Sequence, residues 1–147
     1  MQNLQSNSPL LYLWYAEAEL GNNHGCNLDS SSRAMHILSC LGSGVTYNPF
    51  KCYPSSLQLL RARQGFKEKI NTLRSKWVRG FVDDQSVALV CSAALFEELA
   101  GGWAAGIEII HHVFTMVLPG THRCFFSSFL FFITVDISRV LYLFYVN

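Results

Sequence analysis

The sequence carries little charge of either sign. Only 14% of its 147 residues are charged, whereas about 25% is usual in soluble domains. The formal net charge is +1, which excludes a global field that would attract nucleic acid or acidic partners. Half of the residues are hydrophobic, so much of the surface must be covered by packing, and charge has to be considered segment by segment.

The sequence also lacks paired cysteines and a secretory signal. Its five cysteines include no CxxC pair and follow no regular spacing: Cys26, Cys40, Cys52, Cys91 and Cys124. Such an odd, dispersed set is typical of reduced intracellular thiols. The opening residues, "MQNLQSNSP", have neither the basic start nor the apolar run of a signal peptide. We therefore expect a cytosolic or nuclear protein.

No motif for catalysis, cofactor binding or metal binding is present. The "GSG" at 42–44 lacks the lysine of a phosphate-binding loop, and Glu17 and Glu19 are two apart, so they point away from each other on a helix. Close histidine–cysteine pairs occur without a four-ligand set: His36 with Cys40, His24 with Cys26, and His122 with Cys124. We predict no enzyme, no cofactor and no metal site; a cysteine–histidine pair brought together across the fold is the remaining enzymatic alternative.

The first part of the chain has the pattern of a helical hairpin. Ser8 before Pro9 predicts a helix start, and the helix should run to about Leu20, where Gly21 ends it. A second helix is predicted through "SSRAMHILSCLG", capped by one of the serines at 30–32 and stopped by Gly42.

Three further helices are predicted after a turn-rich loop at 42–56. The longest spans 56–80 and carries one apolar stripe: Leu59, Phe66, Ile70, Leu73 and Trp77. Asp83 or Asp84 should cap a fourth helix over 86–100, and a fifth should run from Trp103 to the Pro-Gly pair at 119–120. The fold class is therefore predicted to be all-α, with the order hairpin, long helix, hairpin.

Seven of the eleven basic residues lie in the long helix, against one acidic residue, Glu68. They could contact phosphate or an acidic partner: Arg61, Arg63, Lys67, Lys69, Arg74, Lys76 and Arg79. The alternative is a solvated face whose long side chains cover apolar surface. Single-stranded nucleic acid binds where aromatic side chains lie between basic residues, so that the nucleobases can stack. No aromatic residues lie between these basic residues, so any direct contact with RNA is expected to be weak.

Residues 121–147 depart from this pattern. They hold six phenylalanines and no lysine, glutamate or glycine. Their uncharged run from Cys124 to Val135 is short of the roughly 20 residues of a membrane span. A buried or aggregation-prone element and a translated intron are the other interpretations. We favour the intron-derived one because the residues are those of thymine-rich codons. A matching spliced junction after Gly120 would contradict it.

The stretch "LYLWYAEAEL" at 11–20 resembles the first helix of a half-a-TPR (HAT) repeat. The matching positions follow the aromatic, aromatic, small residue and glutamate order of that motif, with tyrosine where tryptophan is usual at the first position: Tyr12, Tyr15, Ala16 and Glu19. "SRAMHILSCL" is similar to the second HAT helix, with Arg33 near its start. A poorer second copy has Phe96 and Glu97 in place. Such signature residues pack neighbouring helices together.

More widely, the sequence from Ser8 to Gly120 resembles a plant-type member of the nuclear-RNA-interference-defective family. The segments that carry the resemblance are "SPLLYLWYAEAELGN", "SSRAMHILSCLG", "LLRARQGFKEK" and "GWAAGIEIIHHVFTMVLPG". The resemblance implies a nuclear protein of HAT-like repeats that associates with exosome RNA helicases or splicing factors, in RNA surveillance and RNA interference. Members are much longer, so a fragment or truncated product is implied, and their N-terminal helicase-binding segment has no match here.

These observations predict antiparallel helix hairpins of a HAT/TPR-like α-α superhelix over residues 1–120, followed by an atypical tail over 121–147. The expected function is a non-enzymatic, protein-binding scaffold in the nucleus. The alternative function is a small membrane-associated protein anchored through its apolar tail.

Overall fold

The computed structural model describes residues 8–21, 28–50 and 54–117. The predicted tail, 121–147, and its proposed anchoring or intron origin lie outside these ranges. The described part of the chain is all-helical, as predicted, with five helices in the order α1 (Pro9–Gly21), α2 (Leu28–Ser43), α3 (Ser56–Val78), α4 (Asp84–Gly101) and α5 (Trp103–Val117). Within these ranges no helix is both long and apolar enough to cross a membrane.

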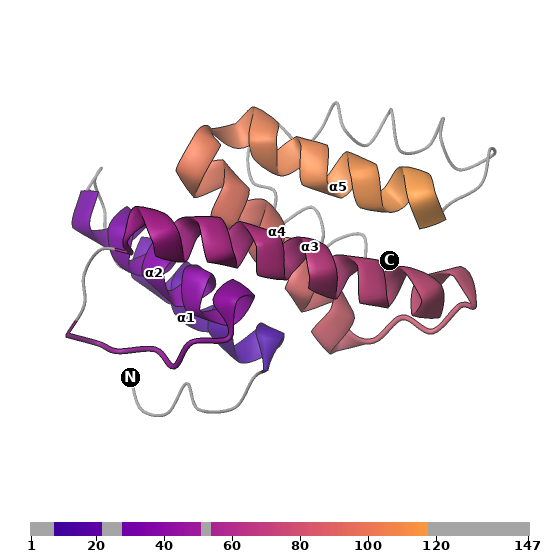
Figure 1. Cartoon of the computed structure of the whole chain (residues 1–147), viewed down its shortest axis with the longest axis horizontal. Coiled ribbons are helices and arrows are strands. Elements are labelled where there is room, and N and C mark those ends of the chain that lie inside the picture. Colours follow the sequence, from indigo (N-terminus) through magenta and orange to yellow (C-terminus); the bar gives the residue numbers. More distant parts are fainter. Residues whose placement is uncertain (1–7, 22–27, 51–53, 118–147) are drawn as a thin grey trace.

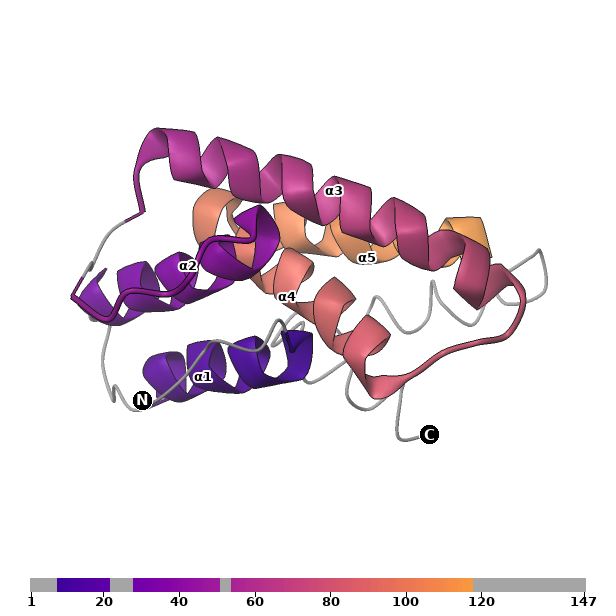
Figure 2. The same cartoon turned by 60° about the horizontal axis from the view of Figure 1, so that its bottom comes forward.

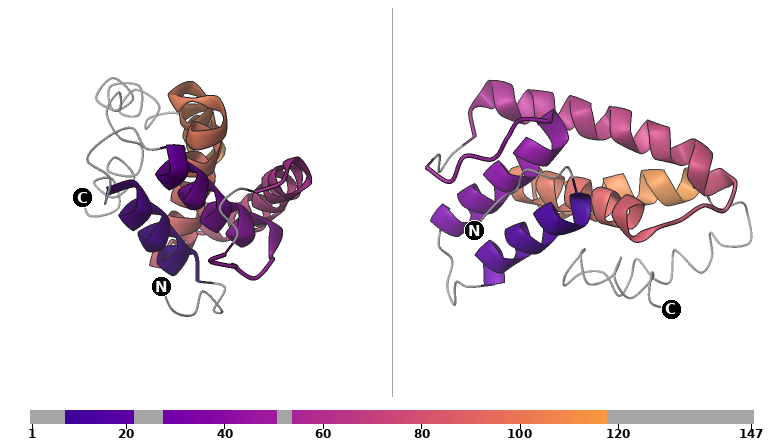
Figure 3. Two further views of the ribbon diagram at one scale, coloured as in Figure 1. Left: turned by 90° about the vertical axis from the view of Figure 1, so that its left-hand side faces the viewer. Right: turned by 90° about the horizontal axis from the view of Figure 1, so that it is seen from below.

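Helix α4 occupies the centre of the arrangement. It contacts each of the other four helices, and ten of its residues, from Ser86 to Phe96, are buried. Helices α1 and α2 lie side by side at one end, while α3 runs along the length of the molecule (Figures 1 and 2). Two further views place α3 on the outside of the bundle (Figure 3). The core is therefore built around one helix that is apolar on nearly all sides.

The predicted helix boundaries are confirmed where their signals are local. Helix α1 begins at Pro9 and α3 begins at Ser56, as predicted. Ser55, for which no role was predicted, caps α3 by accepting a hydrogen bond from the Gln58 amide at 3.1 Å. Asp83 caps α4 in a reciprocal capping box with Ser86. The Ser86 hydroxyl also accepts a hydrogen bond from the buried Trp77 indole at 2.9 Å. One cap thus fixes both the start of α4 and the end of α3.

Two expectations for α2 were wrong. The helix begins at Leu28, so the serines at 30–32 lie inside its first turns and do not cap it. Ser30 instead accepts a hydrogen bond from the Arg33 guanidinium at 3.4 Å. The helix also passes through Gly42 and ends at Ser43, before Gly44 with its positive φ of 73°. Gly42 does not end the helix; it lies against Ala62 and Phe66 of α3, where a side chain would not fit.

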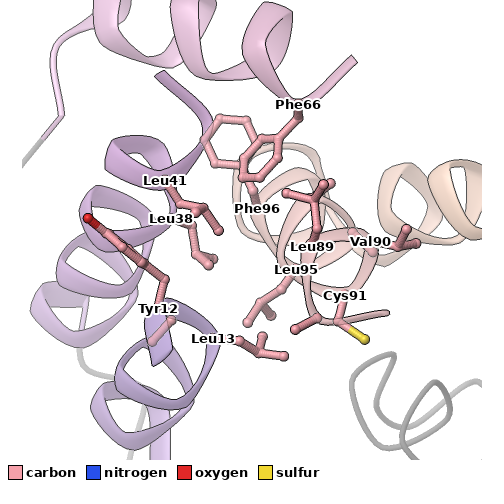
Figure 4. Close-up of a cluster of buried hydrophobic side chains, with 14 of the residues drawn as sticks. Tyr12, Leu13, Leu38, Leu41, Phe66, Leu89, Val90, Cys91, Leu95 and Phe96 are labelled. Atoms are coloured by element: carbon pink, nitrogen blue, oxygen red, sulfur yellow. The ribbon is translucent and has the colours of Figure 1, made fainter. Parts of the chain in front are cut away.

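The apolar stripe predicted on α3 faces the core. Phe66, Ile70 and Trp77 are buried, and the two flanking leucines, at 59 and 73, are partly buried against the same cluster. The Phe66 ring packs on the Phe96 ring of α4 with centroids 5.5 Å apart (Figure 4). This tilted pair joins α3 to the centre of the bundle.

Helices α2 and α3 touch backbone to backbone at two glycines. A Cβ at Gly42 would come 2.7 Å from the Ala62 carbonyl oxygen and from the Phe66 ring. A Cβ at Gly65 would collide with the Gly42 carbonyl oxygen. Only residues without side chains permit so close a crossing, so these two glycines determine how deeply α3 sits on α2.

We predict that Gly65→Ala destabilises the protein. Alanine gains about 1 kcal/mol in helix propensity over glycine, but the added methyl meets backbone that cannot move cheaply. We expect a net loss of about 2 kcal/mol or more in the free energy of unfolding, measured by urea denaturation with circular dichroism. Gly21→Ala is the matched control, because a methyl group at that position would have nothing within 4 Å. A Gly65→Ala protein as stable as wild type would contradict the close crossing.

Candidate functional site

The residues predicted as the first HAT signature lie at the contact between α1 and its neighbours. Tyr12 is 2% exposed and Ala16 is fully buried, while Tyr15 is partly buried against the core. Burial raises the pKa of Tyr12, with a smaller contribution from Cys40 of α2. The Tyr12 side chain lies across α2 (Figure 4). These side chains are used for packing and are not available to a ligand.

The two charged members of the first signature form an ion pair. Arg33 Nε donates to Glu19 Oε2 at 2.9 Å, which joins the last turns of α1 to the first turns of α2. Glu19 keeps 19% of its side-chain surface exposed and Arg33 keeps 34%. The sequence motif identified both residues, and the structure brings them together.

The second, poorer copy has a different arrangement. Phe96 is fully buried, as a packing residue should be. Glu97, however, accepts two hydrogen bonds from the Arg63 guanidinium of α3, at 2.7 and 3.2 Å. This bidentate bond, followed by the negative charge of Glu97, raises the pKa of Arg63. The glutamate of the second copy therefore connects α4 to α3, whereas that of the first connects the two helices of one hairpin.

The seven bases of α3 do not form one uniform surface. Arg63 is paired with Glu97. Lys69 donates to the Leu41 carbonyl of α2, and burial lowers its pKa. Arg79 donates to the Ser75 carbonyl at 3.1 Å. Hydrogen bonds with Ser86 lower the pKa of the Asp83 carboxyl, and the nearby charge of Lys76 adds a smaller effect. Arg61, Lys67 and Arg74 are exposed and make no ion pair within the described ranges.

Of the three histidine–cysteine pairs considered for metal binding, the structure describes His36 with Cys40. The His36 ring is 2% exposed and lies 3.3 Å from the Asn48 carbonyl oxygen through Nε2. It also lies 4.0 Å from the Cys40 sulfur and stacks at an angle on Tyr47, 5.2 Å between centroids. This cluster attaches the loop after α2 to the helix. In the described ranges no three metal-ligating side chains gather; the pairs His24–Cys26 and His122–Cys124 lie outside them.

A groove opens between α3 and α5. It encloses about 620 Å³ and was not predicted, because its walls come from helices that are distant in sequence. Its apolar lining includes Ile70 of α3 together with Ile107 and Val113 of α5. Lys67 and Asn71 form its rim on the α3 side, and Glu108 and two histidines form the rim on α5.

Comparison of the chain with models of protein families, with curated proteins and with solved structures finds no match. Membership of the nuclear-RNA-interference-defective family therefore stays a proposal that rests on the sequence resemblance.

We predict that Cys91 is chemically inert in the folded protein. Burial, with a smaller effect of Glu17, raises its pKa from 9.0 to about 12, so almost no reactive thiolate exists at pH 8. Iodoacetamide should leave Cys91 unmodified in the native protein and alkylate it in urea, as measured by peptide mass spectrometry. Rapid native alkylation at this residue would show that α4 is not central to the bundle.

We also predict measurable coupling between Glu19 and Arg33. In a double-mutant cycle with Glu19→Gln and Arg33→Gln, the partly exposed pair should contribute about 0.5 kcal/mol to the free energy of unfolding. The cycle with Glu97→Gln and Arg63→Gln provides the comparison. A coupling energy of zero in the first cycle would mean that the signature glutamate does not hold the hairpin together.

Proposed function

We propose that this chain is a non-enzymatic, protein-binding helical scaffold that acts in nuclear RNA processing, RNA surveillance and small-RNA-mediated silencing. Its protein partners would be exosome RNA helicases or splicing factors. The finer fold assignment, a HAT/TPR-like superhelix of antiparallel hairpins, is part of the same proposal.

The observation that carries the proposal is the way in which the two hairpins pack. Helix α4 contacts both α1 and α2, and α1 lies against α4 although three connections separate them. In stacked repeats the first helix of one hairpin packs on both helices of the hairpin before it. The pairs α1–α2 and α4–α5 follow this order, and α3 is an additional helix placed outside it.

The side chains of the first hairpin add a second support. Tyr12 and Ala16 are buried where α1 meets the other helices, and Glu19 pairs with Arg33. These are the positions through which the sequence resembles a HAT repeat. A scaffold of this kind binds through the outer faces of its helices, with most of the affinity supplied by a few anchors.

The nuclear role rests on the resemblance of residues 8–120 to the nuclear-RNA-interference-defective family. Affinity purification of the tagged full-length chain from nuclear extract, with mass spectrometry, tests it. We expect RNA helicase or splicing components in the eluate. Ala16→Asp, which places a charge at a fully buried position, should unfold the hairpin and abolish the recovery. Recovery of chaperones alone with both proteins would contradict the proposed function.

A further inference from the structure

The groove between α3 and α5 is an apolar feature of the described surface that the signature residues leave unused. Helix α5 runs beside α3 (Figure 1), and the two helices are in contact. The lining on α5 extends from Ile107 to Val113, six residue steps or about 9 Å along the helix axis. The groove thus has the length of about two helical turns, which matches two apolar side chains one turn apart on a docked helix.

The apolar lining of the groove is a continuation of the core. Ile70 and Val113 are 7% and 4% exposed, and Ile107 is partly buried against the same cluster. These side chains hold their positions because they pack against the bundle from behind. A preformed aliphatic floor of this kind binds an apolar anchor without first having to become ordered.

Positive charge on the α3 side of the groove is not paired with any acidic residue in the described part of the chain. Lys67 borders the groove, and Arg74 follows two turns later on the same side, four residues after Ile70 and three after Asn71. Both are exposed and make no ion pair with a described residue. Arg63, one turn before Lys67, is already neutralised by Glu97. This side of α3 therefore presents one cation at the groove and a second about 10.5 Å further along the axis, beyond the residues that line the groove.

The opposite rim shows where the acidic groups of an occupant would lie. Glu108 is its acidic side chain, beside His111 and His112, so the edge on α5 does not attract a second acidic stripe. Acidic residues of an occupant would face α3, seven positions apart, to match Lys67 and Arg74. The apolar anchors between those edges would enter the groove.

We propose that the α3–α5 groove binds an amphipathic helix of a partner protein, with two apolar anchors one turn apart and acidic residues along the edge that faces Lys67 and Arg74. This proposal rests on the scaffold function and names the chemistry of its partner. An RNA strand fits less well, because the groove lining contains no phenylalanine, tyrosine or tryptophan on which bases could stack. Residues 121–147 contain two arginines and one aspartate, so their charge does not match the rim.

Site-specific photo-crosslinking of the full-length chain tests the proposal. A benzoylphenylalanine in place of Asn71 puts the probe in the groove, and the same replacement of Thr72 puts it on an adjacent, exposed residue outside the lining. In whole-cell extract, the probe at 71 should capture a segment of another protein with the stated pattern of anchors and acids. The probe at 72 should not capture that segment.

Charge reversal tests whether the crosslink depends on the positive charges of Lys67 and Arg74. Lys67→Glu with Arg74→Glu should reduce the crosslink from position 71 by about tenfold, because acids would then face acids. Arg61→Glu is the matched control: this residue is also exposed and makes no ion pair in the described ranges, and it lies away from the groove, so the yield should change by less than about twofold. Circular dichroism confirms that each variant folds.

Several results would overturn the docking proposal. The first group is a crosslink to the wrong molecule: to RNA, to residues 121–147 or to a second copy of the chain. The second group is a captured segment without acidic residues, or no crosslinked product at all. The third is a loss of crosslink yield with Arg61→Glu as large as the loss with the double variant. Other outcomes separate the docking proposal from the nuclear function. Capture of the expected kind of helix from a protein unrelated to RNA would support the groove and contradict the nuclear role. Recovery of RNA-processing proteins by affinity purification, without a crosslink at position 71, would support the nuclear role and contradict docking in the groove.

Discussion

The burial of α4 on nearly every side is the constraint on which the other helices depend. A helix surrounded by four neighbours must offer small side chains where they approach and larger ones where gaps remain. Helix α4 does this with Ala88, Ala93 and Ala94 among its buried positions, and with Phe96 reaching toward α3. Its buried hydroxyl at Ser92 donates to the Ala88 carbonyl at 2.7 Å, so this polar group is satisfied despite its burial.

This central position determines where binding can occur. Of the positions in the HAT-like pattern, Tyr12, Ala16 and Phe96 are buried and Tyr15 is partly buried. The charged positions are occupied by ion pairs. The faces that remain belong to the outer helices. Helix α3 contributes many of them because it lies on the outside of the bundle (Figure 3) and has only one buried stripe. Its sequence therefore has more freedom to vary for a partner than that of α4.

The parts of the fold that were predictable from sequence are those controlled by neighbours in the chain. The Asp83 cap, the start at Pro9 and the stripe from Phe66 to Trp77 each depend on residues within a few turns. The start of α2 was mispredicted because three consecutive serines all resemble caps, and the Gly42 stop because a glycine in contact with another helix resembles a terminator. The partner of Glu97 and the α3–α5 groove depend on which helices pack together, which local patterns do not encode.

The two glutamate–arginine pairs show how the same short motif can have different structural results. Glu19 finds its arginine fourteen residues later, on the helix that immediately follows. Glu97 finds its arginine thirty-four residues earlier, on α3, because α3 contacts α4 and carries Arg63 toward it. Helix α3 therefore binds the polar end of α4 through Arg63, while α5 forms the opposite wall of the groove. With Arg63 neutralised in this way, the positive charge that α3 offers to the groove comes from Lys67 in its lining and from Arg74 two turns further along the helix. In the proposed docking, this spacing sets the pattern of acidic residues on the helical partner.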